Sequence, residues 1–264
     1  MSLVALQRGS RAELGIGDTF AMAGRNIHRL LRAPDQVVFT LVSPILFTLL
    51  FRYVFGGAIR GLGSINYVNY LIPGIAVQTA IFTSSNSGFA LADDRGNGFL
   101  DRLRSLPMAR SAVLIGRVLT DTVSNATGLV IIVIVGLAVG FRPHSVPGLV
   151  VGFGVLLAFV LATSFLFALV GLYASSSQAV NAATFPVIFP LTFASSAFVP
   201  TATMPSWLQG FAKNQPLSVT VSAVRALLEG GPAAHWVWQS LTWSAGIFLV
   251  FFAIALRLYR TSTS

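Results

Sequence analysis

The fold is decided by a stretch of 70 residues that contains no charged side chain. Residues 143–212 read PHSVPGLVVGFGVLLAFVLATSFLFALVGLYASSSQAVNAATFPVIFPLTFASSAFVPTATMPSWLQGFA. A helix needs about 20 apolar residues to cross a bilayer, so this stretch is too long for a single crossing. The polar run at 171–181, which centres on Ser175, Ser176 and Ser177, predicts a turn between two membrane-spanning helices.

Four more charge-free stretches lie at 36–51, 61–92, 122–141 and 230–256. The chain is 55% hydrophobic and 9% charged, whereas a soluble domain carries about 25% charged residues. The pattern predicts an all-α membrane protein with six transmembrane helices, at about 36–56, 69–91, 113–140, 148–174, 179–199 and 237–257. Residues 36–260 then form one transmembrane domain that follows a cytoplasmic segment, residues 1–35.

The distribution of basic residues predicts the orientation of these helices. Twelve of the 17 Lys and Arg residues lie in the termini and the loops on their side of the membrane. The other five are Arg52, Arg60, Arg142, Lys213 and Arg225. Because Lys and Arg accumulate in cytoplasmic loops, both termini of this multi-pass chain are expected in the cytoplasm, with the helices in the plasma membrane. The net charge of +9 therefore does not indicate a nucleic-acid partner.

The N-terminal segment contains a predicted helix that begins at Asp18 or Thr19 and ends before Pro34. Arg25, Arg29 and Arg32 form one basic stripe on it, and apolar residues cover the opposite face. Such a helix is expected to lie in the cytoplasmic membrane interface with its arginines near anionic lipid headgroups. A solvated linker helix is the alternative.

The loop after the second crossing carries a short predicted helix that Pro107 ends. Its apolar residues share one face and its charged residues lie elsewhere: Phe99, Leu103 and Leu106, against Asp101, Arg102 and Arg104. A helix with an apolar ridge and a charged rim fits a groove on a soluble partner. It fits the surface of a bilayer equally well, and the pattern alone does not separate the two.

The segment at about 200–236 predicts two short amphipathic helices at the outer leaflet. Pro216 suits the first turn of the second helix, and Gly230 and Gly231 suit its end. Leu217, Val221, Val224 and Leu228 follow one face of that helix. An outer cap without solute contact is an alternative role for this segment.

The sequence provides no recognisable catalytic or metal-binding motif. A P-loop requires a Lys that follows Gly and precedes Ser or Thr, but the single Lys of the chain stands in Phe211-Ala212-Lys213-Asn214. The chain has no Cys, and its three His residues are isolated from one another. We therefore expect a non-enzymatic chain without a cofactor of its own, whose energy source lies on another protein.

Uncharged polar residues and prolines are the candidates for a solute path through the membrane. They are Ser84, Asn86, Asn125, Pro186 and Pro190. The same residues serve equally well as hydrogen-bonding contacts between helices. Ion coupling is poorly supported because the ionisable candidates inside the membrane are Arg52 and Asp121, and Asp121 is expected to pair with Arg117.

Two motifs give the chain a resemblance to the membrane subunits of ABC-2-type transporters, closest to the daunorubicin/doxorubicin-resistance permeases. The first runs from Gly98-Phe99-Leu100 through Pro107-Met108-Ala109-Arg110 to Gly116-Arg117 and is similar to the family's coupling helix. The acidic residue ahead of that helix corresponds to Asp93 or Asp94. The second comprises Phe198-Val199-Pro200, Pro205-Ser206-Trp207-Leu208, Asn214-Gln215-Pro216 and Arg225. Gln215 departs from the family's commoner Asn-Pro pair.

The resemblance implies an ATP-driven exporter in which this chain is the permease. The implied ATPase-docking residues are Phe99, Leu100, Asp101, Arg102, Leu103, Arg104, Leu106, Pro107 and Arg110. The implied partners are an ABC ATPase subunit that binds ATP and Mg, a second permease copy or a paralogous permease, membrane lipid, and a hydrophobic drug or lipid as solute. An ion-coupled secondary carrier and a non-conducting membrane anchor for an ATPase are the rival interpretations.

Overall fold

The computed structural model describes residues 42, 44–55, 67–98 and 110–261, and this part is helical with no strand. A short apolar helix covers Pro44–Val54 and ends in a π-helical turn, η1 (Phe51–Phe55). The further elements are α4 (Tyr67–Ser84), α5 (Asn86–Gly96), α7 (Arg110–Ala138), α8 (Val146–Tyr173), α9 (Ser177–Phe193), η3 (Thr201–Thr203), α10 (Ser206–Asn214), α11 (Pro216–Glu229) and α12 (Ala234–Thr261).

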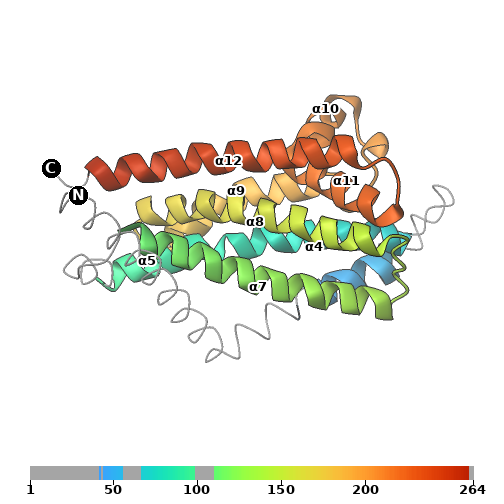
Figure 1. The fold of residues 1–264 in the computed structure, drawn as a ribbon, viewed down its shortest axis with the longest axis horizontal. Coiled ribbons are helices and arrows are strands. Elements are labelled where there is room, and N and C mark those ends of the chain that lie inside the picture. The colour runs from blue at the N-terminus through green and yellow to red at the C-terminus, as the bar shows by residue number, and fades with distance from the viewer. Residues whose placement is uncertain (1–41, 43, 56–66, 99–109, 262–264) are drawn as a thin grey trace, which may run out of the picture.

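Helix α8 is the centre of the bundle, and the other long helices run beside it (Figure 1). It packs against α4, α5, α7, α11 and α12, and to a smaller extent α9. Apolar residues cover α8 on all sides, as expected for a helix surrounded by other helices. Of the most apolar stretch of α8, 67% is buried inside the bundle, whereas 11% of the corresponding stretch of α12 is buried. Helix α12 therefore lies at the periphery.

The helices alternate in direction, so the bundle has two distinct ends (Figure 1). We call the end where α5 stops at Gly96 and α7 begins at Arg110 the loop end; α8 also ends and α9 begins there. We call the opposite end, which carries α10 and α11, the cap end. The backbone of Gly148 at the start of α8 meets that of Leu227 in α11 at the cap end.

Among the described residues, three helical segments are long and apolar enough to cross a membrane: Val118–Ala138, Val146–Tyr173 and Ala234–Ile254. They coincide with the predicted crossings at 113–140, 148–174 and 237–257. The predicted crossings at 36–56 and 179–199 coincide with the shorter helices Pro44–Val54 and α9. The chain is thus a multi-pass helical membrane protein, and the full count of six crossings stays a prediction.

The predicted helix at 69–91 corresponds to two consecutive helices that meet at Ser85, whose backbone angles stay helical (φ −65°, ψ −20°). Helix α4 ends at Ser84 and α5 begins at Asn86, with Ser85 as a turn between them. Three consecutive hydroxyl groups donate back to carbonyls of the preceding turn: Thr83 to Thr79, Ser84 to Ala80 and Ser85 to Phe82. Such bonds compete with the backbone pattern of a helix and bend it.

The predicted turn in the long charge-free stretch is confirmed. Helix α8 ends at Tyr173, and α9 begins at Ser177 after Ser176, whose hydroxyl accepts a hydrogen bond from the Ala179 amide at 3.2 Å. Serine is a preferred N-cap because its oxygen satisfies an otherwise unpaired amide. Helix α11 likewise begins at Pro216 and ends before Gly230, whose φ of 73° is left-handed.

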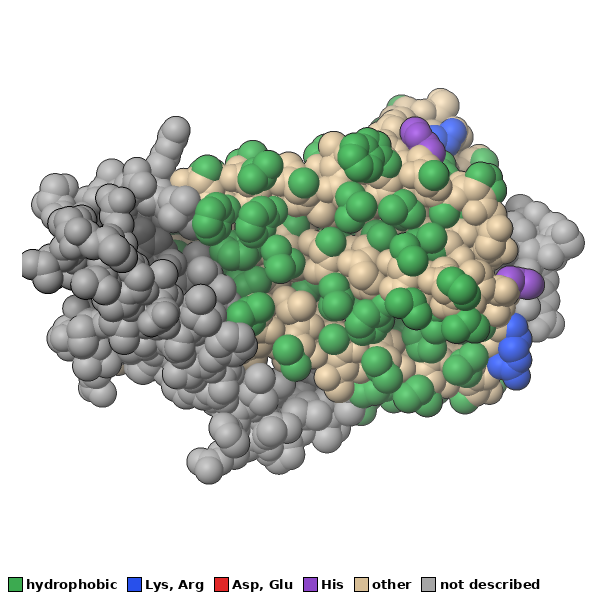
Figure 2. Space-filling model, in the orientation of Figure 1, with side chains coloured by type: hydrophobic (Ala, Val, Ile, Leu, Met, Phe, Trp, Pro, Cys, Tyr) green, Lys and Arg blue, Asp and Glu red, His purple; other side chains and the backbone are tan. Residues whose placement is uncertain are grey.

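The surface of the bundle is predominantly apolar. In Figure 2 hydrophobic side chains spread over the middle of the described surface, and the visible Lys, Arg and His side chains lie near the cap end. Large exposed hydrophobic residues occur on several helices, including Leu46, Val150, Phe185 and Leu249. A surface of this kind suits contact with lipid tails or with another membrane helix.

Candidate functional site

The predicted docking helix lies outside the described residues, although both of its connections are described. Phe99, Leu100, Asp101, Arg102, Leu103, Arg104, Leu106 and Pro107 fall in the segment 99–109, and the predicted interfacial arginines Arg25, Arg29 and Arg32 also lie outside the described part. Helix α5 ends at Gly96, Asn97 caps it, and Gly98 has a left-handed φ of 66°. Arg110 begins α7, and its side chain is outside the described part.

Helix α5 is hydrogen-bonded to three other helices, to α7 near its own start and to α8 and α9 near the loop end. The Ser87 hydroxyl donates to the carboxylate of Asp121 on α7. The Ser177 hydroxyl at the start of α9 donates to the carboxylate of Asp93. The Arg95 guanidinium donates to the backbone carbonyl of Leu172 in the last turn of α8. A positive charge at the C-terminal end of a helix also interacts favourably with the helix dipole. Residues of α5, the helix that precedes the loop at 99–109, are thus bonded to α7, α8 and α9.

Two glycines allow α5 and α8 to approach at backbone distance. A Cβ placed on Gly171 would lie 2.2 Å from the carbonyl oxygen of Gly88, and one on Gly88 would lie 2.6 Å from that of Phe167. Neither position has room for a side chain. Small residues serve this purpose in membrane helices, where close backbone packing stabilises the contact between helices.

The polar residues predicted to line a path are divided between the interior and the surface. Ser84 is fully buried, donates to Ala80 and accepts from Thr163 of α8 at 3.0 Å. Asn125 is buried and donates to the carbonyl of Asp121 at 3.0 Å. Asn86 is exposed at the start of α5. Ser84 and Asn125 therefore make contacts within and between helices, as the alternative interpretation of these residues expects.

Pro186 and Pro190 are exposed on α9, which continues through both of them. Because proline has no amide hydrogen, it cannot donate to the carbonyl four residues earlier, here that of Ala182 or Pro186. The same helix exposes Phe185, Phe189 and Phe193. The ring centroid of Phe189 lies 5.4 Å from that of Phe185 and 4.4 Å from that of Phe193. The stack continues to Phe198, 5.6 Å from Phe193. Sequence reasoning noted the prolines but not this aromatic ladder.

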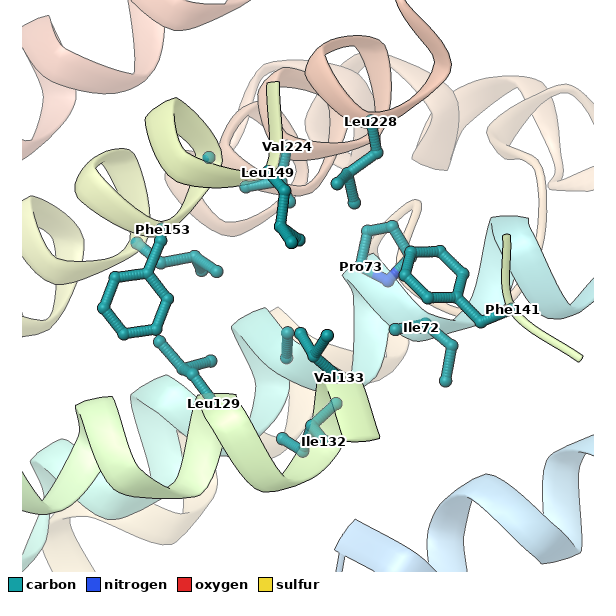
Figure 3. A pocket seen from close by; sticks show the side chains of 13 residues that line it. Ile72, Pro73, Leu129, Ile132, Val133, Phe141, Leu149, Phe153, Val224 and Leu228 are labelled. Carbon is teal, nitrogen blue, oxygen red and sulfur yellow. The ribbon is translucent and has the colours of Figure 1, made fainter. Parts of the chain in front are cut away.

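A small apolar cavity lies between α4, α7, α8 and α11 (Figure 3). Side chains from these four helices point toward it, among them Ile72, Leu129, Phe153 and Val224. Its volume of about 30 Å³ is far below the roughly 300–1,000 Å³ of sites that enclose a drug-sized ligand. This cavity is therefore a packing feature and cannot hold a large solute.

At the cap end, the side chains of Gln215 and Arg225 each donate hydrogen bonds to backbone carbonyls of other segments. Gln215 donates through Nε2 to the carbonyls of Leu191 and Ala194, both at 2.8 Å. Arg225 donates through Nη2 to the carbonyls of Tyr70 and Ser196, at 2.9 and 3.1 Å. Its guanidinium carbon also lies 3.5 Å from the centroid of the Tyr70 ring. Both residues are part of the second motif that the chain shares with the family, but their hydrogen-bond partners are known only from the structure.

The described residues include no cluster of three or more His, Asp or Glu side chains that could hold a metal ion. What the arrangement provides is a set of helices fixed to one another at both ends. At the loop end α5 is held to α8 and α9. At the cap end α11 is held to α4 and to the segment after α9.

Comparison with known proteins identifies relatives over nearly the whole chain. The family model described as "ABC-2 type transporter" matches residues 18–228. The chain is 33% identical to the daunorubicin resistance ABC transporter permease protein DrrB1 of Streptomyces coeruleorubidus, over 99% of this chain and 92% of that protein. In Mycobacterium tuberculosis it is 28% identical to a protein named as a probable doxorubicin resistance ABC transporter permease, DrrC (96% and 92% covered). The chain is also 33% identical to the doxorubicin resistance permease DrrB of the same organism, over 76% of this chain and 74% of that protein.

Proposed function

The chain belongs to the ABC-2 type transporter family, and from this membership we propose that it is the permease subunit of an ATP-driven exporter for a hydrophobic or amphipathic solute. The family match over residues 18–228 carries this proposal. The names of the relatives connect them with daunorubicin and doxorubicin resistance. A drug or a lipid of similar amphipathic character is accordingly the proposed solute, exported across the plasma membrane.

A separate ABC ATPase subunit supplies the energy in this proposal and binds the ATP and Mg. The single Lys of the chain lies in no P-loop, so the chain has no such site for the nucleotide. The ATPase docks on the loop between α5 and α7. Phe99, Leu103 and Leu106 fill its groove, and Asp101, Arg102 and Arg104 line the rim. The loop end and both termini then face the cytoplasm.

The solute path forms between this chain and a second permease, either another copy or a paralogue. The cavity between α4, α7, α8 and α11 is too small to serve as that path. Helix α9 supports a path between two permeases, because its Phe185, Phe189 and Phe193 are between 43% and 51% exposed beside two prolines. The prolines leave carbonyls on α9 without an amide donor. Contact of such a carbonyl with lipid is unfavourable, whereas a polar solute, water or a partner chain can supply a donor.

Charge substitutions in the docking loop test the ATPase contact. We expect Leu103→Asp and Leu106→Asp to abolish co-purification with the matched ATPase and ATP-dependent efflux, because a buried charge in an apolar groove is costly. Ser105→Asp places the same charge between them, off the apolar face, and is the control. If the Leu103 and Leu106 variants keep both the ATPase and the efflux, the docking assignment is wrong.

The two rival functions make different predictions in the same vesicles. An ion-coupled carrier would lose transport when a protonophore removes the proton gradient and would need no ATPase. A non-conducting anchor would retain the ATPase at the membrane without moving any solute. Asp121 gives no support to an ion-coupled carrier, because its carboxylate accepts a hydrogen bond from Ser87 and so contributes to the contact between α5 and α7.

A further inference from the structure

Helix α5 is one of the two helices that connect directly to the docking loop; the other is α7. Helix α5 directly precedes the loop at 99–109, and Ser85 separates it from α4. Helix α5 is bonded laterally to α7, α8 and α9, so a movement of α5 passes to these helices through those contacts.

Helix α9 has its most extensive packing against α5. At its first residue, Ser177 donates a hydrogen bond to the Asp93 carboxylate. One turn farther on, a Cβ on Gly88 would lie 3.1 Å from Cγ1 of Val180, which is fully buried. Beyond this contact only Thr184, Ile188 and Thr192 of α9 are buried, on the same face as Val180. The rest of α9 is largely uncovered.

The start of α9 is thus held from α5, while its far end is held from the cap. Gln215 donates to the carbonyls of Leu191 and Ala194 there. Between the two attachments, the helix carries Pro186 and Pro190, which weaken its internal hydrogen bonding. A helix fastened at both ends and weakened between them bends at the weak point when one end moves.

We propose that Asp93 and Ser177 are positioning residues that transmit the movement of the docking loop from α5 to α9, so that α9 bends at its prolines in each transport cycle. The Arg95 contact with Leu172 carries the same movement to the end of α8. This inference rests on the proposed function, because it requires an ATPase that moves the docking loop.

The test uses the full permease with its matched ATPase in inside-out vesicles, and it measures three quantities. They are co-purification of the two subunits, the rate of ATP hydrolysis, and daunorubicin uptake per ATP hydrolysed. The variants are Asp93→Ala, Ser177→Ala, their combination, and Ser177→Thr, which keeps the hydroxyl. Ser175→Ala lies in the same turn, is exposed and serves as the control.

We expect Asp93→Ala and Ser177→Ala each to lower uptake per ATP by about threefold to tenfold with the subunits still associated and ATP still hydrolysed. The double variant should lose no more than either single variant, since both remove one contact. Ser177→Thr and Ser175→Ala should retain wild-type uptake per ATP. A merely structural defect would reduce association and hydrolysis together and would not be repaired by the hydroxyl of Thr.

Unchanged uptake per ATP in both alanine variants, or additive losses in the double variant, would overturn the inference and leave the proposed function intact. Loss of association or of hydrolysis in the alanine variants would overturn it as well, because the contact would then maintain the fold. Failure of the unmodified pair to take up solute with ATP is a different result: it overturns the proposed function, and the inference with it.

Discussion

Arg225 joins three parts of the chain at the cap end. Its guanidinium bridges the carbonyls of Tyr70 and Ser196 and covers the Tyr70 ring. These contacts join α11 to α4 and to the segment between α9 and α10. Arginine suits the position because its planar group stacks on an aromatic face while its N–H groups donate in the ring plane.

We expect Arg225→Ala to lower the free energy of unfolding by about 2 kcal/mol, because the carbonyls of Tyr70 and Ser196 lose a charged donor and only the Ser196 carbonyl keeps another, the Tyr70 hydroxyl. For a chain of this size that corresponds to a fall in Tm of roughly 4–8 °C, measured in detergent by thermal unfolding. Arg225→Lys should recover only part of the loss, since an ammonium group does not reproduce the stacked geometry.

Lys213→Ala is the matched control for this comparison, because Lys213 is also a cation at the cap end but is exposed. Its Tm should change little, as expected for a surface substitution. Equal Tm values for the Arg225→Ala variant and the unmodified chain would show that the cap does not depend on this side chain.

At the scale of the elements, the crossing of α5 and α8 depends on two glycines. A methyl group on Gly171 would lie 2.2 Å from the Gly88 carbonyl oxygen, so Gly171→Ala forces the helices apart. We expect it to cost about 1–3 kcal/mol of stability and to reduce transport, because α5 loses its position relative to α8. Thermal unfolding and vesicle uptake measure the two effects.

Gly154→Ala on the same helix is the control for that substitution. Gly154 is exposed and has no neighbouring atom within 4 Å of its Cβ position. Since Ala favours a helix over Gly by up to about 1 kcal/mol, this variant should be as stable as the unmodified chain or more so. A Gly171→Ala variant that behaves like Gly154→Ala would contradict the close crossing.

The elements that local chemistry controls could be predicted from the sequence. Ser176 caps α9, Pro216 begins α11 and Gly230 ends it, and each effect acts over a few residues. The irregularity at Ser85 was not predicted because the apolar pattern continues across it. It depends on hydroxyl groups that bond to the preceding turn, and the same residue types also occur inside regular helices.

The contacts of the site could not be predicted in the same way. Asp93 and Ser177 are separated by 84 positions, and Tyr70 and Arg225 by 155. No periodicity in the sequence indicates which distant residues meet, because that depends on how the helices pack. Asp121 illustrates the difference: the sequence predicted Arg117 as its partner, whose side chain lies outside the described part, and the structure shows Ser87 of another helix as a donor to it.

For the whole molecule, the two ends of the bundle are expected to face opposite sides of the membrane. The chain has no Cys, so a single introduced Cys reports its own position without background. We expect Ser206→Cys at the cap end to react with a membrane-impermeant maleimide in intact cells. Ser175→Cys at the loop end should react only after the membrane is opened. The reverse pattern would overturn the orientation that the basic residues predict.

The central claim is that this chain moves a solute with energy from a separate ATPase. The most direct measurement is uptake of daunorubicin and of a fluorescent lipid into inside-out vesicles that contain the chain and its matched ATPase. We predict uptake of one of them that requires ATP and both subunits, stops with a P-loop Lys→Ala ATPase, and survives a protonophore. Uptake that continues with the inactive ATPase, or that ends with the proton gradient while ATP is present, would contradict the account.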